Sequence, residues 1–326
     1  MNLREGEGTP TTGTVTALIV EELVKDYRTR KGPVRALAGV SFRVEEGEIV
    51  GLLGANGAGK TTAIKILCGL LRPTSGRATV LGLSPSRPEV ARRVAALLEG
   101  SRNVYWRLSV EENLRFFAGL QGVPPREARR RSADLVARFG LGDKRRTTAN
   151  LLSQGMKQKL ALACALVKGT PLLLLDEPTL GLDVETSHEL RGMIRELAVS
   201  EGKTVLLSSH DMGVVEDTCR RVVILSRGRV VADDLVPNLL ALFQTRAYRV
   251  SLRDGLPAEA RARLATRLPT LRLLEAERAL EVELSPDQDV YALMDALREA
   301  GVAVEGVSRA EPDLEDVFLR IVRGER

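Results

Sequence analysis

The chain of 326 residues contains little cysteine and few aromatic residues, and it has no long apolar run. Its three cysteines, Cys68, Cys164 and Cys219, stand in apolar or helical contexts without metal-ligand spacing. This pattern excludes a disulfide-stapled fold and a structural zinc site, and it predicts reduced core thiols in a cytosolic protein. No apolar run approaches the roughly 18 residues of a membrane helix, and no secretory signal pattern opens the chain. We therefore expect that the chain cannot cross a bilayer alone.

Apolar and charged residues make up most of what is present. Hydrophobic residues account for 44% of the chain and charged residues for 28%, which predicts a globular protein with a full core and room for a second domain. The formal charge is +5, with 48 basic and 43 acidic residues. This balance permits contact with an anionic membrane surface or a nucleic acid, but it establishes neither.

A glycine-rich stretch between an apolar run and a helix-compatible segment is the most informative part of the chain. It consists of Gly54, Ala55, Asn56, Gly57, Ala58, Gly59, Lys60 and Thr61. Glycines let backbone N–H groups point inward around a phosphate chain, and the helix that follows presents its positive end to the anion. Lys60 is then placed to reach the β- and γ-phosphates, and Thr61 to bind Mg²⁺. The alternative is a glycine-rich turn that matches the phosphate-loop pattern by chance. The apolar run at residues 49–53 and the helix-compatible segment at residues 62–68 argue against this alternative.

Two acids follow a run of four leucines at residues 172–175. Four leucines without alternation predict a central strand that is covered on both faces. Doubly wound sheets bind their ligands at the carboxyl ends of such strands. Asp176 is therefore placed for Mg²⁺, and Glu177 for a water near the γ-phosphate. The alternative is a pair of acids in a loop after a core strand.

One of the two histidines follows a second apolar run. Residues 204–209 predict another buried strand, and His210 comes directly after it. The strand-end argument used for Asp176 places His210 near the γ-phosphate. His188 lies inside a helical segment and is predicted to be a surface residue.

The remaining pattern predicts an α/β core with a helical insertion. Short strands are predicted at residues 17–20 and 40–44, and helices at residues 90–98, 110–120 and 125–139. We expect a flexible tail over residues 1–16, a first domain over 17–240 whose helical part spans about 100–155, and a second domain over 241–326.

The ordered motifs resemble the nucleotide-binding subunit of an ATP-binding cassette (ABC) transporter over about two-thirds of the chain. They are residues 54–61, Leu-Ser-Gln-Gly-Met at 152–156, residues 172–177, Gly-Leu-Asp at 181–183, and His210. The resemblance implies the fold of a P-loop NTPase cassette, with a mixed sheet core, an antiparallel β subdomain and a helical subdomain.

The resemblance also implies cofactors, ATP and Mg²⁺, and a role for each matching residue. Tyr27 would stack on the adenine, Thr62 would extend the phosphate site, Lys60 and Glu177 would be catalytic, and His210 would sense the γ-phosphate. The signature residues Ser153, Gln154, Gly155 and Met156 would complete the site of a second subunit, so that two subunits hold two ATP molecules between them. A lone aromatic residue is more often a packing residue, so packing within the protein is the alternative interpretation of Tyr27.

Two positions depart from the family pattern. The signature reads Leu-Ser-Gln-Gly-Met where Leu-Ser-Gly-Gly-Gln is commoner, but its serine and second glycine are present. The family glutamine that contacts Mg²⁺ is missing from residues 97–108, where Glu99 is the nearest substitute. A carboxylate at this position can still bind a hard cation through oxygen.

Two further features in the helical insertion have alternative interpretations. Tyr105 and Trp106 stand together in a chain with only 3% aromatic residues. They belong either to a groove that receives a permease or to the core of the helical subdomain. The charged run 126–131 is interpreted as a solvated face, with a lipid-facing patch as the alternative.

The C-terminal part predicts a small α+β domain. Residues 248–304 have the order β-α-β-β-α-β, which is typical of a ferredoxin-like unit, and a last helix follows at 314–319. This part resembles the accessory domain that follows the cassettes of drug-resistance and sodium-extrusion exporters, whose last helix often reads Leu-Glu-Asp-x-Phe.

The resemblance implies an ATP-hydrolysing subunit that drives a separately encoded integral-membrane permease and pairs with a second ATP-binding cassette subunit. An exporter of drugs, ions or other amphipathic substrates is the favoured type, attached peripherally to the cytoplasmic face of the cell membrane, and no nucleic acid is expected as a partner. The alternative is a soluble cassette ATPase that acts on nucleic acid or the ribosome. A small-molecule kinase would explain the phosphate loop but would leave Ser153 and His210 without a role.

Overall fold

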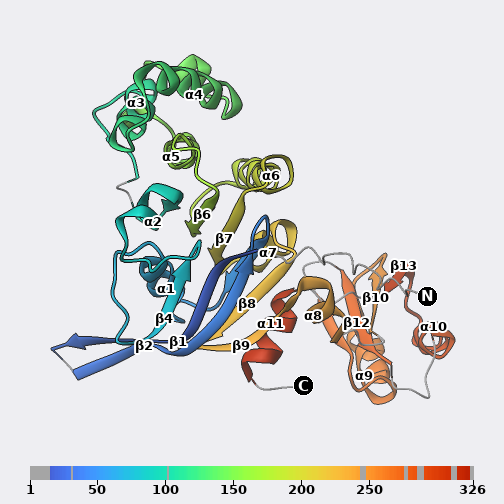
Figure 1. Cartoon of the computed structure of the whole chain (residues 1–326). Coiled ribbons are helices and arrows are strands. Elements are labelled where there is room, and N and C mark those ends of the chain that lie inside the picture. The colour runs from blue at the N-terminus through green and yellow to red at the C-terminus, as the bar shows by residue number, and fades with distance from the viewer. Residues whose placement is uncertain are drawn as a thin grey trace, which may run out of the picture. The chain divides into compact units, whose positions relative to one another are not determined.

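The chain forms two compact units, Met1–Val236 and Pro237–Arg326 (Figure 1). The computed structural model describes residues 15–30, 32–100, 103–242, 247–274, 278–284, 290–309 and 314–323. The tail predicted for residues 1–16 therefore lies almost wholly outside the described residues. No helix in these described ranges is long and apolar enough to cross a membrane.

The first unit is built on a six-stranded sheet with the strand order β5-β6-β7-β3-β8-β9. Its strands are β3 (Ile49–Leu53), β5 (Val94–Leu97), β6 (Leu172–Asp176), β7 (Thr204–Ser209), β8 (Arg221–Ser226) and β9 (Arg229–Leu235). All neighbours are parallel except β8 and β9. Every residue of β6 is buried, as predicted for a strand covered on both faces.

Strand register brings the predicted site residues to one edge of this sheet. Leu53, the last residue of β3, pairs with Ser209 at the end of β7. Asp176, the last residue of β6, pairs with Ser208. Because the strands are parallel, the segments that follow them all leave from the same edge.

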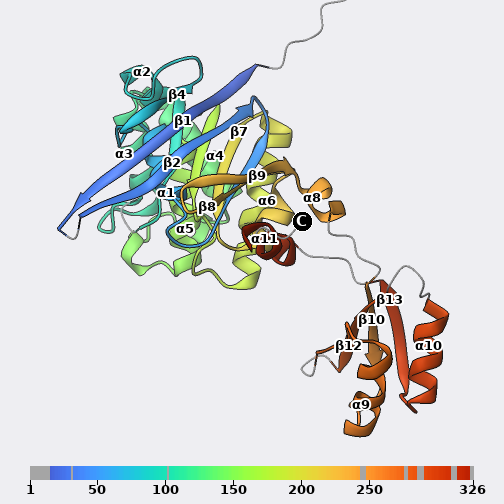
Figure 2. The same ribbon diagram turned by 90° about the horizontal axis from the view of Figure 1, so that it is seen from below.

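A second sheet is antiparallel and has the order β2-β1-β4. Its strands are β1 (Thr16–Thr29), β2 (Gly32–Glu45) and β4 (Ser75–Val80). Helix α1 (Lys60–Leu67) joins the two sheets in one core, in which Leu18 of β1, Ile64 of α1 and Leu174 of β6 belong to the same cluster. Figure 2 shows this sheet lying across the central strands.

The predicted strands at 17–20 and 40–44 are correct in type but too short. Each belongs to a strand of 14 residues in a long hairpin. The pairing of β1 with β2 shifts register between Val20 and Leu23, and Glu22 has a φ of 46°. Such a bulge interrupts the alternation of apolar and polar residues along the strand, which explains why the predicted strand was too short.

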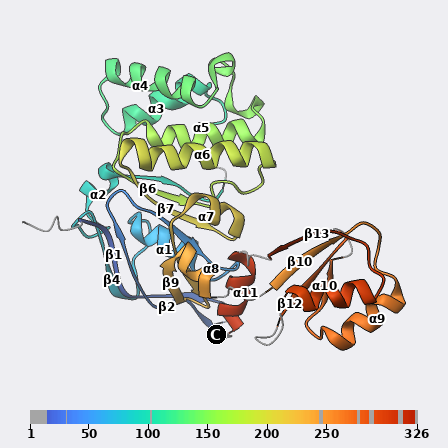
Figure 3. The same cartoon turned by 90° about the vertical axis from the view of Figure 1, so that its right-hand side faces the viewer.

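Helices cover the central sheet and form the insertion. They are α2 (Pro88–Arg93), α3 (Val110–Leu120), α4 (Pro125–Arg138), α5 (Gln154–Leu166), α6 (Val184–Glu201) and α7 (Met212–Thr218), with short 3-10 turns η1 (Gly142–Lys144) and η2 (Ala149–Leu151). A further helix, α8 (Val236–Leu242), follows β9 where the second unit begins. Figure 3 shows α5 and α6 side by side, with α3 and α4 beyond α5.

The helix predicted over 90–98 is wrong in its second half. The helix α2 ends at Arg93, and Val94–Leu97 forms β5, which pairs in parallel with β6. A short apolar run does not distinguish a buried helix from a buried strand, and here the run completes an edge of the central sheet. The helices predicted at 110–120 and 125–139 are confirmed as α3 and α4.

The second unit contains a four-stranded antiparallel sheet with the order β11-β12-β10-β13. Its elements are β10 (Ala247–Leu252), α9 (Ala258–Arg267), β11 (Arg272–Leu274), β12 (Ala279–Glu283), α10 (Val290–Glu299), β13 (Val304–Arg309) and α11 (Leu314–Arg323). Val250 and Leu280 of the sheet share a core with Leu264 of α9 and Leu297 of α10. Both helices therefore pack on the same face of the sheet, and the predicted β-α-β-β-α-β order is present.

The last predicted strand of this unit, at 302–304, is displaced toward the C-terminus. Val302 donates its backbone N–H to the carbonyl of Leu297 and so closes the end of α10. The strand β13 begins only at Val304. Residues 302 and 303 thus belong to the turn after α10 and not to the strand. The apolar pattern alone does not distinguish these two states.

Candidate functional site

The glycine-rich loop connects β3 to α1 at the edge where the central strands end. Gly57 and Gly59 have φ values of 82° and 109°. A Cβ on Gly59 would lie 2.6 Å from the carbonyl oxygen of Ala36, so this position combines a left-handed backbone with a close approach that only glycine allows. No side chain caps the start of α1, and its first turn holds no acid. The unpaired N–H groups there can receive an anion.

Lys60 is buried in this loop, with only 6% of its surface exposed. Its Nζ donates to the carbonyl oxygen of Gly54 at 2.6 Å and lies 3.5 Å from Oε1 of Glu177. A buried ammonium group needs such partners because losing water is costly. The loop lysine and the acid that follows β6 therefore face each other.

Asp176 is 1% exposed, and its two carboxylate oxygens differ. Oδ1 accepts hydrogen bonds from Thr61 Oγ1 at 3.2 Å and from Ser208 Oγ at 2.6 Å. Oδ2 is buried and has no hydrogen-bond partner within the described residues. An unpaired buried acceptor costs about 1–3 kcal/mol, so this oxygen is suited to a cation.

The donor set around Asp176 fits Mg²⁺. A carboxylate oxygen and the Thr61 hydroxyl are hard oxygen ligands, and Mg²⁺ bound with nucleotides takes few ligands from the protein. In the described part of the chain no group of three or more His, Cys, Asp or Glu side chains could hold a metal by itself. The residues therefore suit an ion whose other ligands are phosphate oxygens and water.

Glu177 is held from two sides. Its Oε1 faces Lys60, and its Oε2 lies 2.9 Å from Nδ1 of His210. Its backbone has a φ of 52°, a left-handed conformation that is uncommon outside glycine, and its N–H is 3.1 Å from the carbonyl oxygen of Ser208. The side chain of Glu177 is 7% exposed whereas that of His210 is 41% exposed, so the histidine approaches from the open side.

Ser208 is a site residue that the sequence analysis missed. Its hydroxyl donates to Asp176 and lies 3.2 Å from the N–H of Glu177, and its side chain is fully buried. One signal was available, since a hydroxyl residue follows the apolar run 205–207 just before the strand ends. The pairing of Ser208 with Asp176 depends on the strand order, which the sequence does not specify.

Tyr27 lies on β1 next to the phosphate loop. Its hydroxyl is 3.3 Å from Oγ1 of Thr62, and Nζ of Lys25 lies 5.4 Å from its ring centroid. The two loop threonines therefore point to different elements, Thr61 toward Asp176 and Thr62 toward Tyr27. The structure thus places the Tyr27 hydroxyl beside the first turn of α1, which directly follows the phosphate loop.

Two cavities meet at Glu177. The first has a volume of 420 Å³, and its lining includes Glu99, Trp106, Gln158, Asp176 and Glu177. The second has a volume of 280 Å³ and is lined by Glu177, His210 and the Gly181 turn, among others. Glu99 thus lines the same cavity as both strand-end acids.

The signature residues lie at the N-terminus of α5. Ser153 caps this helix, because its Oγ accepts a hydrogen bond from the N–H of Met156 at 3.2 Å. Ser153 and Gln154 are exposed, whereas Gly155 is buried. Within the described residues no hydrogen bond connects Ser153 to the phosphate loop of the same chain. The structure therefore separates these two predicted parts of the site.

The aromatic pair 105–106 only partly packs into the helical insertion. The ring of Tyr105 makes an edge-on contact with Phe116, with centroids 4.6 Å apart, and Asn113 accepts a hydrogen bond from its backbone N–H. Even so, Tyr105 is 50% exposed and Trp106 is 55% exposed. Packing in the core of the helical insertion therefore explains the position of one face of the Tyr105 ring, but it does not explain Trp106.

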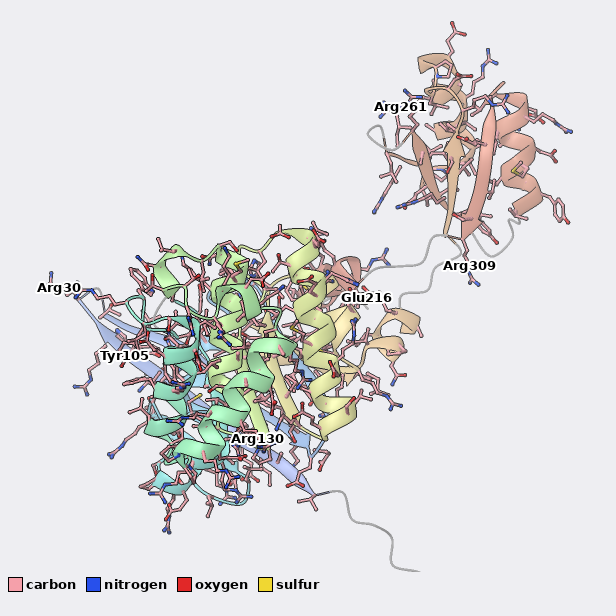
Figure 4. All side chains as sticks on the ribbon, turned by 90° about the horizontal axis from the view of Figure 1, so that it is seen from above. Arg30, Tyr105, Arg130, Glu216, Arg261 and Arg309 are labelled. Atoms are coloured by element: carbon pink, nitrogen blue, oxygen red, sulfur yellow. The ribbon has the colours of Figure 1, made fainter. Side chains whose placement is uncertain are left out.

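The charged run on α4 is largely solvated, as predicted. Arg126, Arg129 and Arg130 are exposed, and Figure 4 shows Arg130 on the outer face of the helix. Arg131 differs, because its Nη1 donates to the carbonyl oxygens of Val167 and Lys168. One arginine of the run thus closes the C-terminal end of α5.

The three cysteines are free thiols, and Cys164 and Cys219 are buried. Burial raises the pKa of Cys68 to about 12, and the negative charge of Asp176 adds to the shift. Burial also raises the pKa of Cys164 and of Cys219. Because the thiolate is the reactive form, these groups are inert core residues, as the sequence predicted.

Comparison with known proteins gives the same family throughout. Residues 37–180 match the family described as ABC transporter. The chain is 34% identical over 313 residues to the daunorubicin resistance ATP-binding protein DrrA3 of Streptomyces coeruleorubidus, which covers 95% of this chain and 97% of the relative. It is 39% identical over 207 residues to the ABC transporter ATP-binding protein NatA of Bacillus subtilis, covering 63% of this chain and 84% of that protein.

Solved structures resemble about two-thirds of this chain. A dimeric ATP-binding cassette in a post-hydrolysis state with bound ADP and Pi is 25% identical, with a TM-score of 0.62 over 67% of this chain and 98% of that chain. An ATP-binding subunit of an ABC transporter is 34% identical, with a TM-score of 0.62 over 70% of this chain and 93% of that chain.

Proposed function

The chain belongs to the ABC transporter family as an ATP-binding subunit, and from this premise we propose that it powers an exporter of drugs, ions or other amphipathic compounds. Its activity is ATP hydrolysis with ATP and Mg²⁺, and it works with a membrane permease and a second ATP-binding subunit. The similarity to DrrA3 supports the exporter type, because it covers 95% of this chain and so extends beyond the cassette. The alternative of an ATPase acting on nucleic acid or the ribosome is not favoured.

One observation carries the proposed chemistry, namely that Lys60 and His210 contact opposite oxygens of Glu177 beside the unpaired Oδ2 of Asp176. We assign phosphate binding to the N–H groups of the glycine-rich loop and to Lys60, which exchanges the Gly54 carbonyl for phosphate oxygens. Thr61 and Asp176 hold Mg²⁺, and Glu99 faces the same cavity as a further oxygen ligand. When bound, Mg²⁺ supplies positive charge that offsets the charge of the phosphates.

Glu177 is the group that orients the attacking water and takes its proton. Its backbone conformation and the Ser208 contacts fix where the carboxylate points. His210 positions that carboxylate from the exposed side and is placed to respond to the γ-phosphate. Tyr27 supplies a stacking surface for the adenine next to Thr62. Ser153 to Met156 present the start of α5 to the ATP held by the other subunit.

We place the subunit at the cytoplasmic face of the cell membrane, where its permease holds it. The exposed Tyr105 and Trp106 are suited to the permease contact, because aromatic residues are enriched among interface anchors. Isolation of the complex from membranes, followed by identification of the partner, tests this placement. Recovery with RNA and without a membrane protein would refute it.

The substitution Glu177→Gln tests the proposed chemistry. Steady-state ATPase activity should fall by about 10²–10⁴-fold, because the amide cannot accept the proton of the water. Glu46→Gln is the matched control, since Glu46 is an exposed carboxylate in the turn before β3, at the other end of that strand. Full activity of Glu177→Gln would show that the role given to this carboxylate is wrong.

A further inference from the structure

The first turns of α5 rest on the segment that follows Glu177, here called the linking segment (residues 178–186). Nε2 of Gln158 donates to the carbonyl oxygen of Pro178 at 2.7 Å. Pro178 is buried and is the residue directly after Glu177. A buried carbonyl needs a donor, and Gln158 supplies it from a different element. This hydrogen bond therefore reaches within one residue of the proposed catalytic carboxylate.

A second contact joins α5 to the far end of the linking segment. A Cβ on Gly155 would lie 2.7 Å from Cγ2 of Thr186, so the signature glycine lies directly against that side chain. Thr186 is itself fixed by Asp183, whose carboxylate accepts from its N–H at 2.8 Å and from its hydroxyl at 2.9 Å. The two ends of the linking segment thus contact the first two turns of α5, Thr186 at the signature glycine and Pro178 at Gln158.

These contacts connect two functions within one chain. The carboxylate of Glu177 serves the ATP on the chain's own phosphate loop, whereas Ser153 at the start of α5 serves the ATP of the other subunit. Asp183 uses both carboxylate oxygens on Thr186, so this acid acts inside its own chain. A shift of α5 would therefore be transmitted to Glu177 through Gln158 and Thr186.

We propose that Gln158 is a positioning residue that fixes Glu177 relative to the signature turn, so that hydrolysis in one ATP site depends on the helix that serves the other. This inference rests on the proposed function, because it requires two subunits that share two sites. A purely structural role of Gln158 would stabilise α5 and leave the chemistry of its own subunit unaffected.

The test uses two full-length chains that are each inactive. The active-site chain carries Ser153→Asp, which keeps a capping side chain on α5 but places a negative charge toward the phosphate of the other subunit. The donor chain carries Lys60→Ala, which disables its own phosphate loop and leaves its signature intact. Only the mixed dimer contains one complete site, so ATPase activity measured with excess donor chain reports that site alone.

Gln158→Met is then introduced into the active-site chain, whose signature is already disabled. Methionine keeps the approximate shape of glutamine but lacks the N–H group that donates to Pro178. We expect kcat to fall about five- to tenfold with little change in KM. Gln158→Glu, which keeps size and polarity, should lower kcat at least as much. Thermal unfolding and ATP binding of each chain show whether the variants are folded.

Lys159→Met is the matched control. Lys159 lies next to Gln158 on α5 and pairs with Glu189 of α6, outside the linking segment. It should leave kcat unchanged in the active-site chain. An equal loss with Lys159→Met, or unchanged kcat with folded Gln158→Met and Gln158→Glu, would overturn the proposal. If the mixture without these substitutions has no ATPase activity, it is the shared-site function that fails.

Discussion

The phosphate-loop region and the signature turn differ in how complete each is within one chain. Lys60, Asp176 and Glu177 are 6%, 1% and 8% exposed and contact one another or a shared serine. Ser153 and Gln154 are exposed, and the only described hydrogen bond of the Ser153 hydroxyl caps its own helix. Burial of polar groups is costly unless they have partners, and these three buried groups have them, so the first region forms a finished half-site within one chain. Under the proposed function, the exposed second region contacts the ATP that another subunit holds.

Of the three substitutions that compare these two regions, Asp176→Asn in the finished half-site should have the largest effect. Asparagine keeps the size of the side chain and an acceptor for Thr61 and Ser208, but it removes the charge that suits Oδ2 to Mg²⁺. ATPase activity should fall by about 10²–10³-fold, with a higher Mg²⁺ concentration needed for half-maximal rate. Asp134→Asn, at a carboxylate that is 66% exposed, is the control. If the Mg²⁺ dependence of Asp176→Asn equals that of the unmodified protein, Asp176 does not bind the metal.

A smaller effect, about a hundredfold, is expected from Ser153→Asp on the ATPase activity of the homodimer, because the new carboxylate faces a phosphate across the interface. Binding of ATP to the isolated chain should stay within about twofold of the unmodified protein, since no hydrogen bond among the described residues links Ser153 to the phosphate loop. Equilibrium binding and steady-state hydrolysis measure the two quantities. If the isolated Ser153→Asp chain no longer binds ATP, Ser153 contributes to the phosphate site of its own chain, and the proposed difference between the two regions is wrong.

The smallest effect is expected at Tyr27, at the margin of the finished half-site. Base stacking contributes about 1–3 kcal/mol, so Tyr27→Ala should raise the Kd for ATP by roughly 5- to 150-fold. Tyr27→Phe keeps the ring and loses only the contact with Thr62, so its effect should be a few-fold at most. Nucleotide titration of both variants measures this. If Tyr27→Ala lowers thermal stability but leaves Kd unchanged, Tyr27 is a packing residue.

The sequence predicts the finished half-site well because local patterns specify it. The glycine loop, the lysine and the acids after β6 follow from a strand, a turn and a helix that are adjacent in the chain, and parallel pairing brings the strand ends together. Ser208 and Gln158 were missed because each acts on a residue at least 20 positions away, at Asp176 and Pro178. No local pattern specifies such contacts.

The fold shows the same limit. Helices α3 and α4 were predicted from the spacing of their apolar residues. In the structure their starts agree with helix-capping rules, because Ser109 and Glu112 form a capping box and α4 begins at Pro125. The strand β5 was taken for a helix because its four residues are apolar without a period, and only β6 beside it decides its conformation. Tertiary pairing sets the state of such short runs.

Trp106 gives the molecule a property that follows from the scarcity of aromatic residues. It is the single tryptophan of the chain, it is half exposed, and it lines the cavity that also contains Asp176 and Glu177. The emission of an indole changes with the water and charge around it. The chain therefore carries one intrinsic fluorescent reporter at the wall of this cavity, and its emission during a nucleotide titration reports changes around Asp176 and Glu177 without an added dye.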